Sequence, residues 1–594
     1  MPSLGGEVYL RRSHETRMKT FSQLKKNLKN DFSRLQPLRV AVLGDTATQF
    51  LTQALRGTGF DDGFDLQIWE ADFNQIERQV FDPASELYAF KPELVILFQS
   101  SHKLLGKYNK LETEKKGGLA KARLELIEEL FTAVHSRLKA KVLYYNYPEI
   151  DDSVFGNYAS KVESSFLFQL RKLNYELMLL AGRHSNLYLC DLSSIQNRVG
   201  KNTVFQPSIY LNTEMVLSLD VLPEVAARTL AVIGALQGKF KKCLILDLDN
   251  TLWGGVIGDD GIENIQLGSL GVGKAFSEFQ GWIRKLIDRG IILCVCSKNT
   301  ESVAKEPFEK HPDMVLRLKD ISVFVANWEN KADNIRHIQG ILNIGFDSMV
   351  FLDDNPFERN IVRETIPGIT VPELPEDPAD YLEYLYAQNL FETISLSQED
   401  TERTKLYQVE AERKEFQGKF TNEEEFLESL DMVSLVEPFT KFNTPRVAQL
   451  SQRSNQFNLR TARYTESDIE SLSTSENVFP FAFGLQDKFG DHGMICVVIL
   501  KKEAPDTLFI DTWLMSCRVL KRGMENFVLN TVANFAREKG YTTLKGEYLP
   551  TAKNDMVKDH YSGLGFQSDG ASGRWILNTL TYENKKCAIR KETA

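Results

Sequence analysis

The stretch Lys241–Gly261, KKCLILDLDNTLWGGVIGDDG, decides how the middle of this chain is expected to fold. Its apolar run Cys243–Leu246 predicts a buried parallel strand that delivers two carboxylates, Asp247 and Asp249. Because side chains alternate along a strand, residues two apart point to the same side. Two carboxylates this close are stable beside a cation, so the spacing predicts a divalent metal ion.

Three further groups of polar residues follow in the order that one shared site would need. Ser297 ends an apolar run, Lys331 lies early in a helical pattern, and a third apolar run ends in Asp353 and Asp354. Each alone could be an ordinary polar residue at the end of a strand. Together they predict a site at the carboxyl edge of one parallel sheet, where open α/β sheets bind ligands.

The residues around Asp247 resemble a known motif. DLDNT, which ends at Thr251, is similar to the first motif, DxDxT, of the haloacid-dehalogenase (HAD) superfamily, and the longer LDLDNTLWGGVIGDDG is similar to its FkbH-like branch. The resemblance implies that Asp247 attacks a phosphoryl group and forms an aspartyl-phosphate. It also implies that Asp249 protonates the leaving group and later activates water.

The same resemblance assigns a cofactor and the remaining site residues. Mg²⁺ is expected to contact Asp247, the backbone carbonyl of Asp249 and a carboxylate from Asp353 or Asp354, with Asp354 favoured for the direct bond. Lys331 is expected to offset the charge around the nucleophile. The expected substrate-binding residues of this region are Thr251, Ser297, Lys298 and Asn299.

Length and composition favour an ordinary multidomain protein. A chain of 594 residues is expected to form about three domains. The net charge of −10 argues against bulk binding of nucleic acid but leaves room for a local basic pocket. The 7 cysteines lack metal-ligand spacing and are expected to be reduced thiols. No long apolar run and no signal peptide are recognised, so we expect a cytoplasmic protein with no membrane partner.

Strand and helix patterns alternate from Leu38 onward, which predicts a parallel sheet covered on both faces. The first strand ends in Gly44-Asp45-Thr46, which resembles the GDS start of SGNH-type hydrolases with Thr46 in place of the serine. A threonine nucleophile needs a general base, yet residues 217–230 contain no histidine of the expected Asp-x-x-His. We expect a catalytically silent domain, with an active esterase as the alternative.

The C-terminal third predicts strands around a helix at Met524–Glu538, with the loop Arg518–Gly523 before it and His560–Phe566, HYSGLGF, after it. This order resembles a GNAT-type acyltransferase fold, in which backbone N–H groups before the central helix bind the pyrophosphate of coenzyme A. The loop here is less rich in glycine. The phosphopantetheine arm of a carrier protein is therefore the expected ligand, rather than free coenzyme A.

The expected fold class is α/β with three domains: an SGNH- or flavodoxin-like parallel sheet, a HAD-type Rossmann-like parallel sheet with a minimal cap, and a GNAT-like mixed α+β sheet. The expected divisions are a helical segment at 1–37, then domains at 38–238 and 239–390, a helical connector at 391–431 and a domain at 432–594. The charged residues of the connector are expected to form a solvated face: Arg403, Lys405, Glu410, Glu412 and Arg413.

The FkbH-like resemblance also implies a substrate and a partner. Such proteins are associated with taking a glyceryl unit from a small phosphorylated acid and loading it on an acyl carrier protein or its pantetheine thiol. Cys517 is the candidate for a transient acyl acceptor, because Arg518 beside it would favour the thiolate. A small core residue at a strand end is the competing interpretation of Cys517.

Two further groups of polar residues have open roles. Arg453, Asn455, Asn458 and Arg463 suit the binding of a carboxylate or phosphate, with a solvated loop as the alternative. His492 suits a general base or, equally, a turn.

The sequence therefore predicts a Mg²⁺-dependent HAD-type enzyme that acts on a small phosphorylated acid or acyl phosphate and passes the acyl group toward a thiol. A plain phosphatase, whose other domains only select the substrate or partner, is the nearest alternative. A scaffold with a silent metal site is the third, and the intact set of motifs weighs against it.

Overall fold

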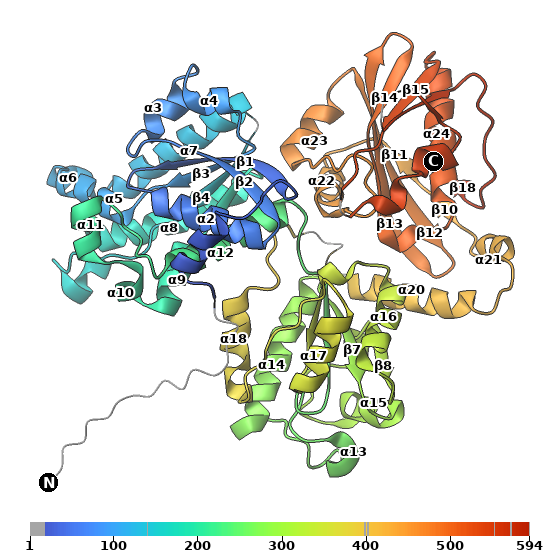
Figure 1. Cartoon of the computed structure of the whole chain (residues 1–594), viewed down its shortest axis with the longest axis horizontal. Helices are drawn as coiled ribbons and strands as arrows, with labels where there is room; N and C mark the ends of the chain where they lie inside the picture. Colours follow the sequence, from blue (N-terminus) through green and yellow to red (C-terminus); the bar gives the residue numbers. More distant parts are fainter. Residues whose placement is uncertain are drawn as a thin grey trace. The chain divides into compact units, whose positions relative to one another are not determined.

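The structure is a computed structural model, and it describes residues 18–138, 140–396, 400, 403–551, 553–570 and 573–592. The chain divides into two compact units, one of Thr16–Ala235 and one that contains Leu236–Ala594. Figure 1 shows the second unit as a parallel α/β domain followed by a domain built on a larger mixed sheet. No helix among the described residues has both the length and the apolar composition to cross a membrane.

The unit of Thr16–Ala235 is built on a parallel five-stranded sheet in the order β2-β1-β3-β4-β5. Its strands are β1 Gln36–Gly44, β2 Phe64–Glu70, β3 Leu94–Phe98, β4 Lys141–Tyr145 and β5 Leu187–Cys190. Its helices are α1 Phe21–Asn27, α2 Gln49–Asp61, α3 Ile76–Phe81, α4 Glu86–Phe90, α5 Ser101–Asn109, α6 Thr113–Lys116, α7 Leu119–Leu138, α8 Phe166–Arg183, α9 Leu192–Val199, α10 Lys201–Val204, α11 Pro207–Thr213 and α12 Leu222–Leu236. The alternation of strands and helices that the sequence predicted is confirmed.

The central domain contains a parallel four-stranded sheet in the order β8-β7-β6-β9. Its strands are β6 Cys243–Leu246, β7 Ile292–Ser297, β8 Val323–Ala326 and β9 Met349–Leu352. Its helices are α13 Ile257–Asp260, α14 Gly271–Asp288, α15 Glu301–Lys310, α16 Lys331–Leu342, α17 Pro356–Thr365 and α18 Tyr381–Gln388. Only the four-residue helix α13 lies between the end of β6 and α14, so no cap domain is inserted there.

The two faces of this sheet explain its unbroken apolar strands. Leu244 and Leu246 of β6 pack in the core beneath α14, whereas Cys243 and Ile245 pack in a second core with residues of α16. Because alternate side chains point to opposite faces, a strand buried on both sides must be apolar at every position. The polar residues can then begin only where the strand ends.

The C-terminal domain is a mixed nine-stranded sheet in the order β16-β17-β15-β14-β13-β12-β10-β18, with β11 paired to β12. Its strands are β10 Val433–Ser434, β11 Val436–Glu437, β12 Val478–Asp487, β13 Gly490–Ala504, β14 Thr507–Met515, β15 Thr543–Glu547, β16 Gln567–Ser568, β17 Arg574–Asn578 and β18 Arg590–Lys591. Its helices, with those of the connector, are α20 Arg403–Gln417, α21 Glu423–Ser429, α22 Thr444–Arg453, α23 Glu466–Ser473, α24 Met524–Glu538 and α25 His560–Gly563.

One feature of this sheet was not predicted. β14 pairs with β15 only over Thr507–Phe509, and beyond that point the two strands separate. The separated half of β14 bonds instead to residues 457–459: Leu459 N donates to Trp513 O at 3.2 Å, and Met515 N donates to Phe457 O at 3.0 Å. On the other side of this segment, Leu549 N donates to Leu459 O at 2.9 Å. The chain thus fills the gap between its own strands.

Candidate active site of the central domain

The four polar groups of the sequence motifs meet at the carboxyl edge of the central sheet. β6 and β9 are parallel neighbours with Leu246 opposite Leu352, so the residues that follow them, Asp247 and Asp353, emerge side by side. One carboxylate oxygen from each of Asp247, Asp353 and Asp354 lies within 4.8 Å of the other two. We call these three aspartates, with Lys331, the acidic cluster.

Lys331, the first residue of α16, is the cation of this cluster. Its Nζ lies 2.9 Å from Asp247 Oδ1 and donates to Asp353 Oδ2 at 2.6 Å. The side chain is only 4% exposed. Burial alone would lower the pKa of Lys331, but the carboxylates of Asp247 and Asp353 outweigh burial and raise it. The ammonium group is therefore held charged between the two acids.

Three carboxylates against one ammonium leave the cluster with an excess of negative charge. Burial and then the neighbouring charge of Asp247 raise the pKa of Asp353 to about 7, although Lys331 opposes that shift. Burial and Asp247 also raise the pKa of Asp354. Such shifts mark a site that is incompletely neutralised by its own side chains. Carboxylate oxygens at this spacing fit a hard divalent cation such as Mg²⁺.

Asp353 and Asp354 differ in how fully their oxygens are engaged. Asp353 accepts from Lys331 Nζ at Oδ2 and from Asn355 N at Oδ1, the latter at 2.8 Å. Asp354 Oδ1 accepts from Thr251 Oγ1 at 3.2 Å, and among the described residues no donor is found for its second oxygen. This difference supports Asp354 as the direct metal ligand, which stays a prediction.

Asp249 lies apart from the three clustered carboxylates and is held by its own donors. Its Oδ1 accepts from Trp253 Nε1 and from Ile257 N, both at 3.0 Å, and its Oδ2 accepts from Asn299 Nδ2 at 3.1 Å. Burial, the largest effect, raises the pKa of Asp249. A carboxyl group that keeps its proton more readily suits a general acid. Its expected contact with a metal through the backbone carbonyl remains untested.

The other expected substrate-binding residues of this domain surround the cluster. Ser297 is buried at the end of β7. Lys298 Nζ forms an ion pair of 2.6 Å with Glu358 Oε1. Thr251 and Asn299 support Asp354 and Asp249 through the hydrogen bonds given above. A contact of any of them with substrate stays a prediction.

Sequence reasoning missed Arg359, which braces the loop after β9. Its Nη1 donates to the backbone carbonyls of Asp353 and Asp354, both at 2.7 Å, and its Nε donates to Glu373 Oε2 at 3.0 Å. The side chain is buried in the fold. A signal was present, since a basic residue four positions into a helix that follows two aspartates can reach back to them.

The polar residues expected to bind an anion in the C-terminal domain lie elsewhere. Lys242 Nζ donates to Arg453 O at 3.2 Å, which places Arg453 at the amino end of β6, opposite the acidic cluster. Asn455 donates to Gly238 O at 2.7 Å and accepts from Arg463. Asn458 is fully buried and accepts from Thr461 N at 2.8 Å. The solvated-loop alternative is therefore wrong for Asn458, and the structure does not bring these residues to the aspartates.

The remaining residues singled out in the C-terminal domain have different surroundings. The backbone of Cys517 begins a short 3₁₀ turn after β14, and its side chain lies outside the described part of the structure. Its neighbour Arg518 is buried and donates from Nε to Ser516 Oγ at 3.4 Å. The acyl-acceptor role of Cys517 stays a prediction.

His492 lies within β13, so the turn-forming alternative is wrong. It belongs to a buried ionic network that we call the Asp487 network, composed of Glu410, Arg413, Asp487, His492 and Arg522. His492 Nε2 lies 3.0 Å from Asp487 Oδ2 and 2.9 Å from Arg413 Nη2. The predicted solvated face of the connector is wrong for Arg413, which is only 2% exposed. A helix pattern cannot show that a partner from another element covers a charged face.

Among the described residues, no group of acids comparable to the acidic cluster is found at the carboxyl edge of the N-terminal sheet. Asp45 Oδ1 accepts from Ser100 N at 2.9 Å, and burial raises the pKa of Asp45 to about 6. Thr46 is fully buried, and among the described residues its Oγ1 has no hydrogen-bond partner. The catalytic silence of this domain stays a prediction.

Two comparisons with known proteins give extensive matches to this chain. The family model for the FkbH N-terminal domain matches residues 39–234. A crystal structure described as the N-terminal part of BF1531 from Bacteroides fragilis, containing a phosphatase domain complexed with Mg, is 58% identical. The match covers 64% of this chain and 100% of that chain, with a TM-score of 0.62.

Other similarities are weaker. The ribosomal-protein-S18-alanine N-acetyltransferase from Escherichia coli is 17% identical, with 24% of this chain and 91% of that chain covered and a TM-score of 0.19. The GNAT domain of S. lividans PAT is 20% identical, with coverages of 24% and 89% and a TM-score of 0.20. TM-scores this low support no conclusion about the fold or function of this chain. No curated protein matches the chain. This chain is 58% identical to the BF1531 fragment over the whole of that fragment, and it contains an FkbH N-terminal domain. It therefore belongs to the FkbH-like family of phosphatase-domain proteins.

Proposed function

We propose that the central domain is a Mg²⁺-dependent phosphatase of the HAD type that works through an aspartyl-phosphate on Asp247. The observation that carries the proposal is the acidic cluster itself, in which two buried carboxylates and one partly buried carboxylate gather around one ammonium group at the carboxyl edge of a parallel sheet. The relative from Bacteroides fragilis, crystallised with Mg, supports the choice of metal.

Asp247 and Asp354 would hold Mg²⁺, together with the backbone carbonyl of Asp249. Bound there, the ion supplies positive charge that neutralises phosphate oxygens and lets an anionic carboxylate approach them. The donor set fits, because hard oxygen ligands and an uncompensated negative charge are what Mg²⁺ requires.

The residues of the chain then divide the work. Asp247 attacks phosphorus, and the bond from phosphorus to the leaving oxygen breaks as the aspartyl-phosphate forms. Asp249 gives its proton to the leaving oxygen and later takes one from the attacking water. Lys331, 2.9 Å from Asp247, holds it in place and offsets its charge. Thr251 holds Asp354 in position, and Asn299 holds Asp249.

Phosphate release from p-nitrophenyl phosphate tests this assignment. Wild type is expected to release phosphate with Mg²⁺ and to lose that activity with EDTA, and Asp247→Asn is expected to be inactive under both conditions. Asp333→Asn is the matched control, because Asp333 lies exposed on the helix that begins at Lys331. Equal activity of Asp247→Asn and wild type would refute the role of Asp247.

The finer part of the proposal is that phosphoryl chemistry is coupled to acyl transfer. A small phosphorylated acid of the glyceryl-phosphate type would be the substrate, and a carrier-protein thiol would receive the acyl group. If the substrate is an acyl phosphate, a thiolate attacks the carbonyl carbon, a thioester forms and phosphate leaves, so the step needs no other reactant. Cys517 is the proposed transient acceptor.

The packing of the central and C-terminal domains in one compact unit supports coupling. A plain phosphatase that uses this domain only for recognition is the alternative. Incubation with 1,3-bisphosphoglycerate and a holo carrier protein, followed by intact mass measurement, separates the two. Coupling predicts an acyl adduct on the pantetheine that is lost in Cys517→Ala. Absence of an adduct with several carriers and donors would leave the plain phosphatase.

A further inference from the structure

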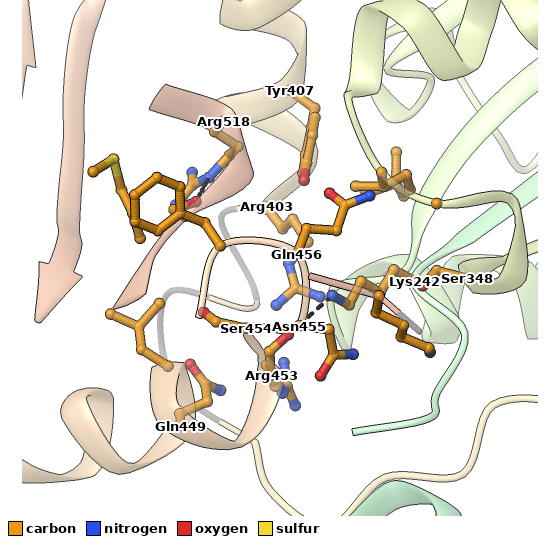
Figure 2. Close-up of a pocket in the computed structure, with 18 of the residues that line it drawn as sticks. Lys242, Ser348, Arg403, Tyr407, Gln449, Arg453, Ser454, Asn455, Gln456 and Arg518 are labelled. Carbon is orange, nitrogen blue, oxygen red and sulfur yellow. Dashed lines mark hydrogen bonds between the residues drawn. The ribbon is translucent and has the colours of Figure 1, made fainter. Parts of the chain in front are cut away.

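A cavity of about 440 Å³ lies within the unit of Leu236–Ala594, between the central and C-terminal domains. The central domain contributes Lys242 and residues 344–348, and the C-terminal domain contributes the end of α22 and the end of β14. Figure 2 shows Lys242, Arg403, Arg453 and Arg518 approaching it from separate elements. Its volume is in the range of small-molecule sites.

This cavity is not part of the acidic cluster. Lys242 precedes β6, Ile292 begins β7, and Ser348 precedes β9, so the cavity meets the amino edge of the central sheet. The aspartates lie at the carboxyl edge. A four-residue strand spans about 13 Å between the two edges, and the side chains of both strand faces fill the sheet layers between them. A ligand here would occupy a second site.

The charge of the cavity wall is strongly positive. Among the described residues that line it, six side chains are cationic and one, Asp347, is acidic and forms an ion pair with Lys553. The cations are Lys242, Arg403, Arg446, Arg453, Arg518 and Lys553. Guanidinium groups gathered from several elements match the geometry of phosphate and carboxylate oxygens.

The protein holds these cations close together at an electrostatic cost. Asp400 is fully buried and pairs with both Arg403 and Arg453 through one oxygen, while its second oxygen accepts from Gln449 at 2.5 Å. Burial and the neighbouring Arg403 lower the pKa of Arg453 to about 10, despite the opposing effect of Asp400. An anion in the cavity would relieve this repulsion.

The wall also has an apolar part. Ile344, Leu450, Phe457 and Met515 line the cavity together with the cations. A bare inorganic ion would leave this surface in contact with water, whereas an organic group attached to the anion would cover it.

We propose that this cavity binds a small organic phosphate, a molecule with at least two negative charges and an attached organic portion, at a site separate from the phosphatase centre. The guanidinium groups bind the charged end, and the apolar wall contacts the organic portion. The inference does not depend on the chemistry proposed for Asp247. The organic portion has two possible sources, a nucleoside or a pantetheine.

Calorimetric titration of the full chain with pyrophosphate, in buffer with EDTA and no Mg²⁺, tests the charged end of the site. Binding is expected in wild type and is expected to weaken by about tenfold or more in Arg446→Gln and in Lys553→Gln. Arg446→Lys is expected to retain part of the affinity. Lys405→Gln is the matched control, because Lys405 is an exposed cation on α20, which also carries Arg403. Thermal denaturation of each variant verifies folding. Lys553 is partly exposed, so Lys553→Gln tests the site even if Arg446→Gln does not fold.

Asp247→Asn distinguishes this cavity from the phosphatase centre. The proposal predicts an unchanged affinity for pyrophosphate in Asp247→Asn. No binding by wild type at millimolar pyrophosphate, equal affinity in Lys553→Gln and Lys405→Gln, or a loss confined to Asp247→Asn would each overturn it.

Titration with ADP and with 4′-phosphopantetheine then identifies the organic portion, since the tighter ligand is the better match. If neither binds more tightly than pyrophosphate, the assignment of the apolar wall is overturned.

Discussion

The acidic cluster and the Asp487 network are both buried groups of charged side chains, but their charges balance differently. In the acidic cluster, the ammonium group of Lys331 pairs with Asp247 and Asp353, and Asp354 adds a third carboxylate. In the Asp487 network, two carboxylates, Glu410 and Asp487, meet two guanidinium groups, Arg413 and Arg522. The network is complete within the chain, whereas the cluster requires a cation from outside.

The difference also appears in the direction of the pKa shifts. Burial and Asp247 raise the pKa of Asp353 to about 7, whereas His492 and Arg413 outweigh burial and lower the pKa of Asp487 to about 2. Burial is the largest effect on both groups, and the nearby cations outweigh it only for Asp487. The balance of charge therefore distinguishes the candidate active site from the Asp487 network.

Breaking the balanced network is expected to have the largest effect on stability. Arg413→Met removes a cation that pairs with Asp487 at 3.0 Å and with Glu410. The uncompensated charge is expected to destabilise the C-terminal domain by about 3–5 kcal/mol. Urea denaturation of the full chain, followed by hydrogen exchange in β13, measures this loss.

Phosphate release per folded molecule is expected to be unchanged in Arg413→Met. Arg336→Met, which removes an exposed guanidinium paired with Asp333, is the control and is expected to cost less than about 1 kcal/mol. Equal stability of the two variants would contradict the structural role of the network.

Removing the single cation of the unbalanced cluster is expected to affect catalysis instead. Lys331→Met deletes the ammonium group that contacts Asp247 and Asp353. Phosphate release with saturating Mg²⁺ is expected to fall by about 100- to 1000-fold, because a charge that stabilises the transition state is lost. Lys298→Met, which removes a partly exposed partner of Glu358, is the comparison and is expected to lose less activity. A larger loss in Lys298→Met would reverse the assigned roles.

A smaller effect is expected from the imidazole in the network. Burial lowers the pKa of His492, and the nearby Arg413 and Arg522 lower it further against the effect of Asp487. Because this pKa is lowered, the folded protein favours the neutral form of the ring. Below about pH 6.5 the unfolded chain takes up a proton that the folded chain resists, so stability falls as the pH decreases.

His492→Gln is expected to reduce this pH dependence. Between pH 7.5 and 5.5, the loss of stability attributable to His492 is about 1 kcal/mol. Denaturation of both proteins at the two pH values measures it. An identical pH dependence in wild type and His492→Gln would show that the imidazole charges equally in the folded and unfolded states.

The smallest effect is expected at the other parallel sheet. Thr46→Val removes a buried hydroxyl that has no hydrogen-bond partner among the described residues. Neither phosphate release nor ester hydrolysis is expected to change by more than about twofold, since no polar interaction is lost. An esterase activity that disappears in Thr46→Val would show that the N-terminal domain is catalytic.

The sequence contained most of the information that locates the acidic cluster. Apolar runs at β6, β7 and β9 are continuous because both faces of the sheet are covered, and each run ends where its polar residue begins. Because the strands are parallel, their order in the sheet is enough to bring those ends together at one edge. The expected role of Lys331 came instead from the resemblance to the HAD superfamily, and the structure places its Nζ 2.9 Å from Asp247.

What could not be predicted depends on contacts between elements distant in sequence. The burial of Arg413 results from Asp487 and His492 on the β12–β13 hairpin, some seventy positions away. The insertion of residues 457–459 beside β14 likewise depends on where β14 and β15 separate. Neither contact leaves a periodic pattern in the sequence, because the partners are distant along the chain.

The central claim is that a phosphoryl group is transferred to Asp247. Rapid acid quenching of the enzyme during turnover of p-nitrophenyl phosphate with Mg²⁺, followed by peptide mass spectrometry, tests it directly. A phosphoryl adduct on Asp247, absent from Asp247→Asn, is the predicted result. Phosphate release without any adduct, or an adduct on another residue, would contradict it.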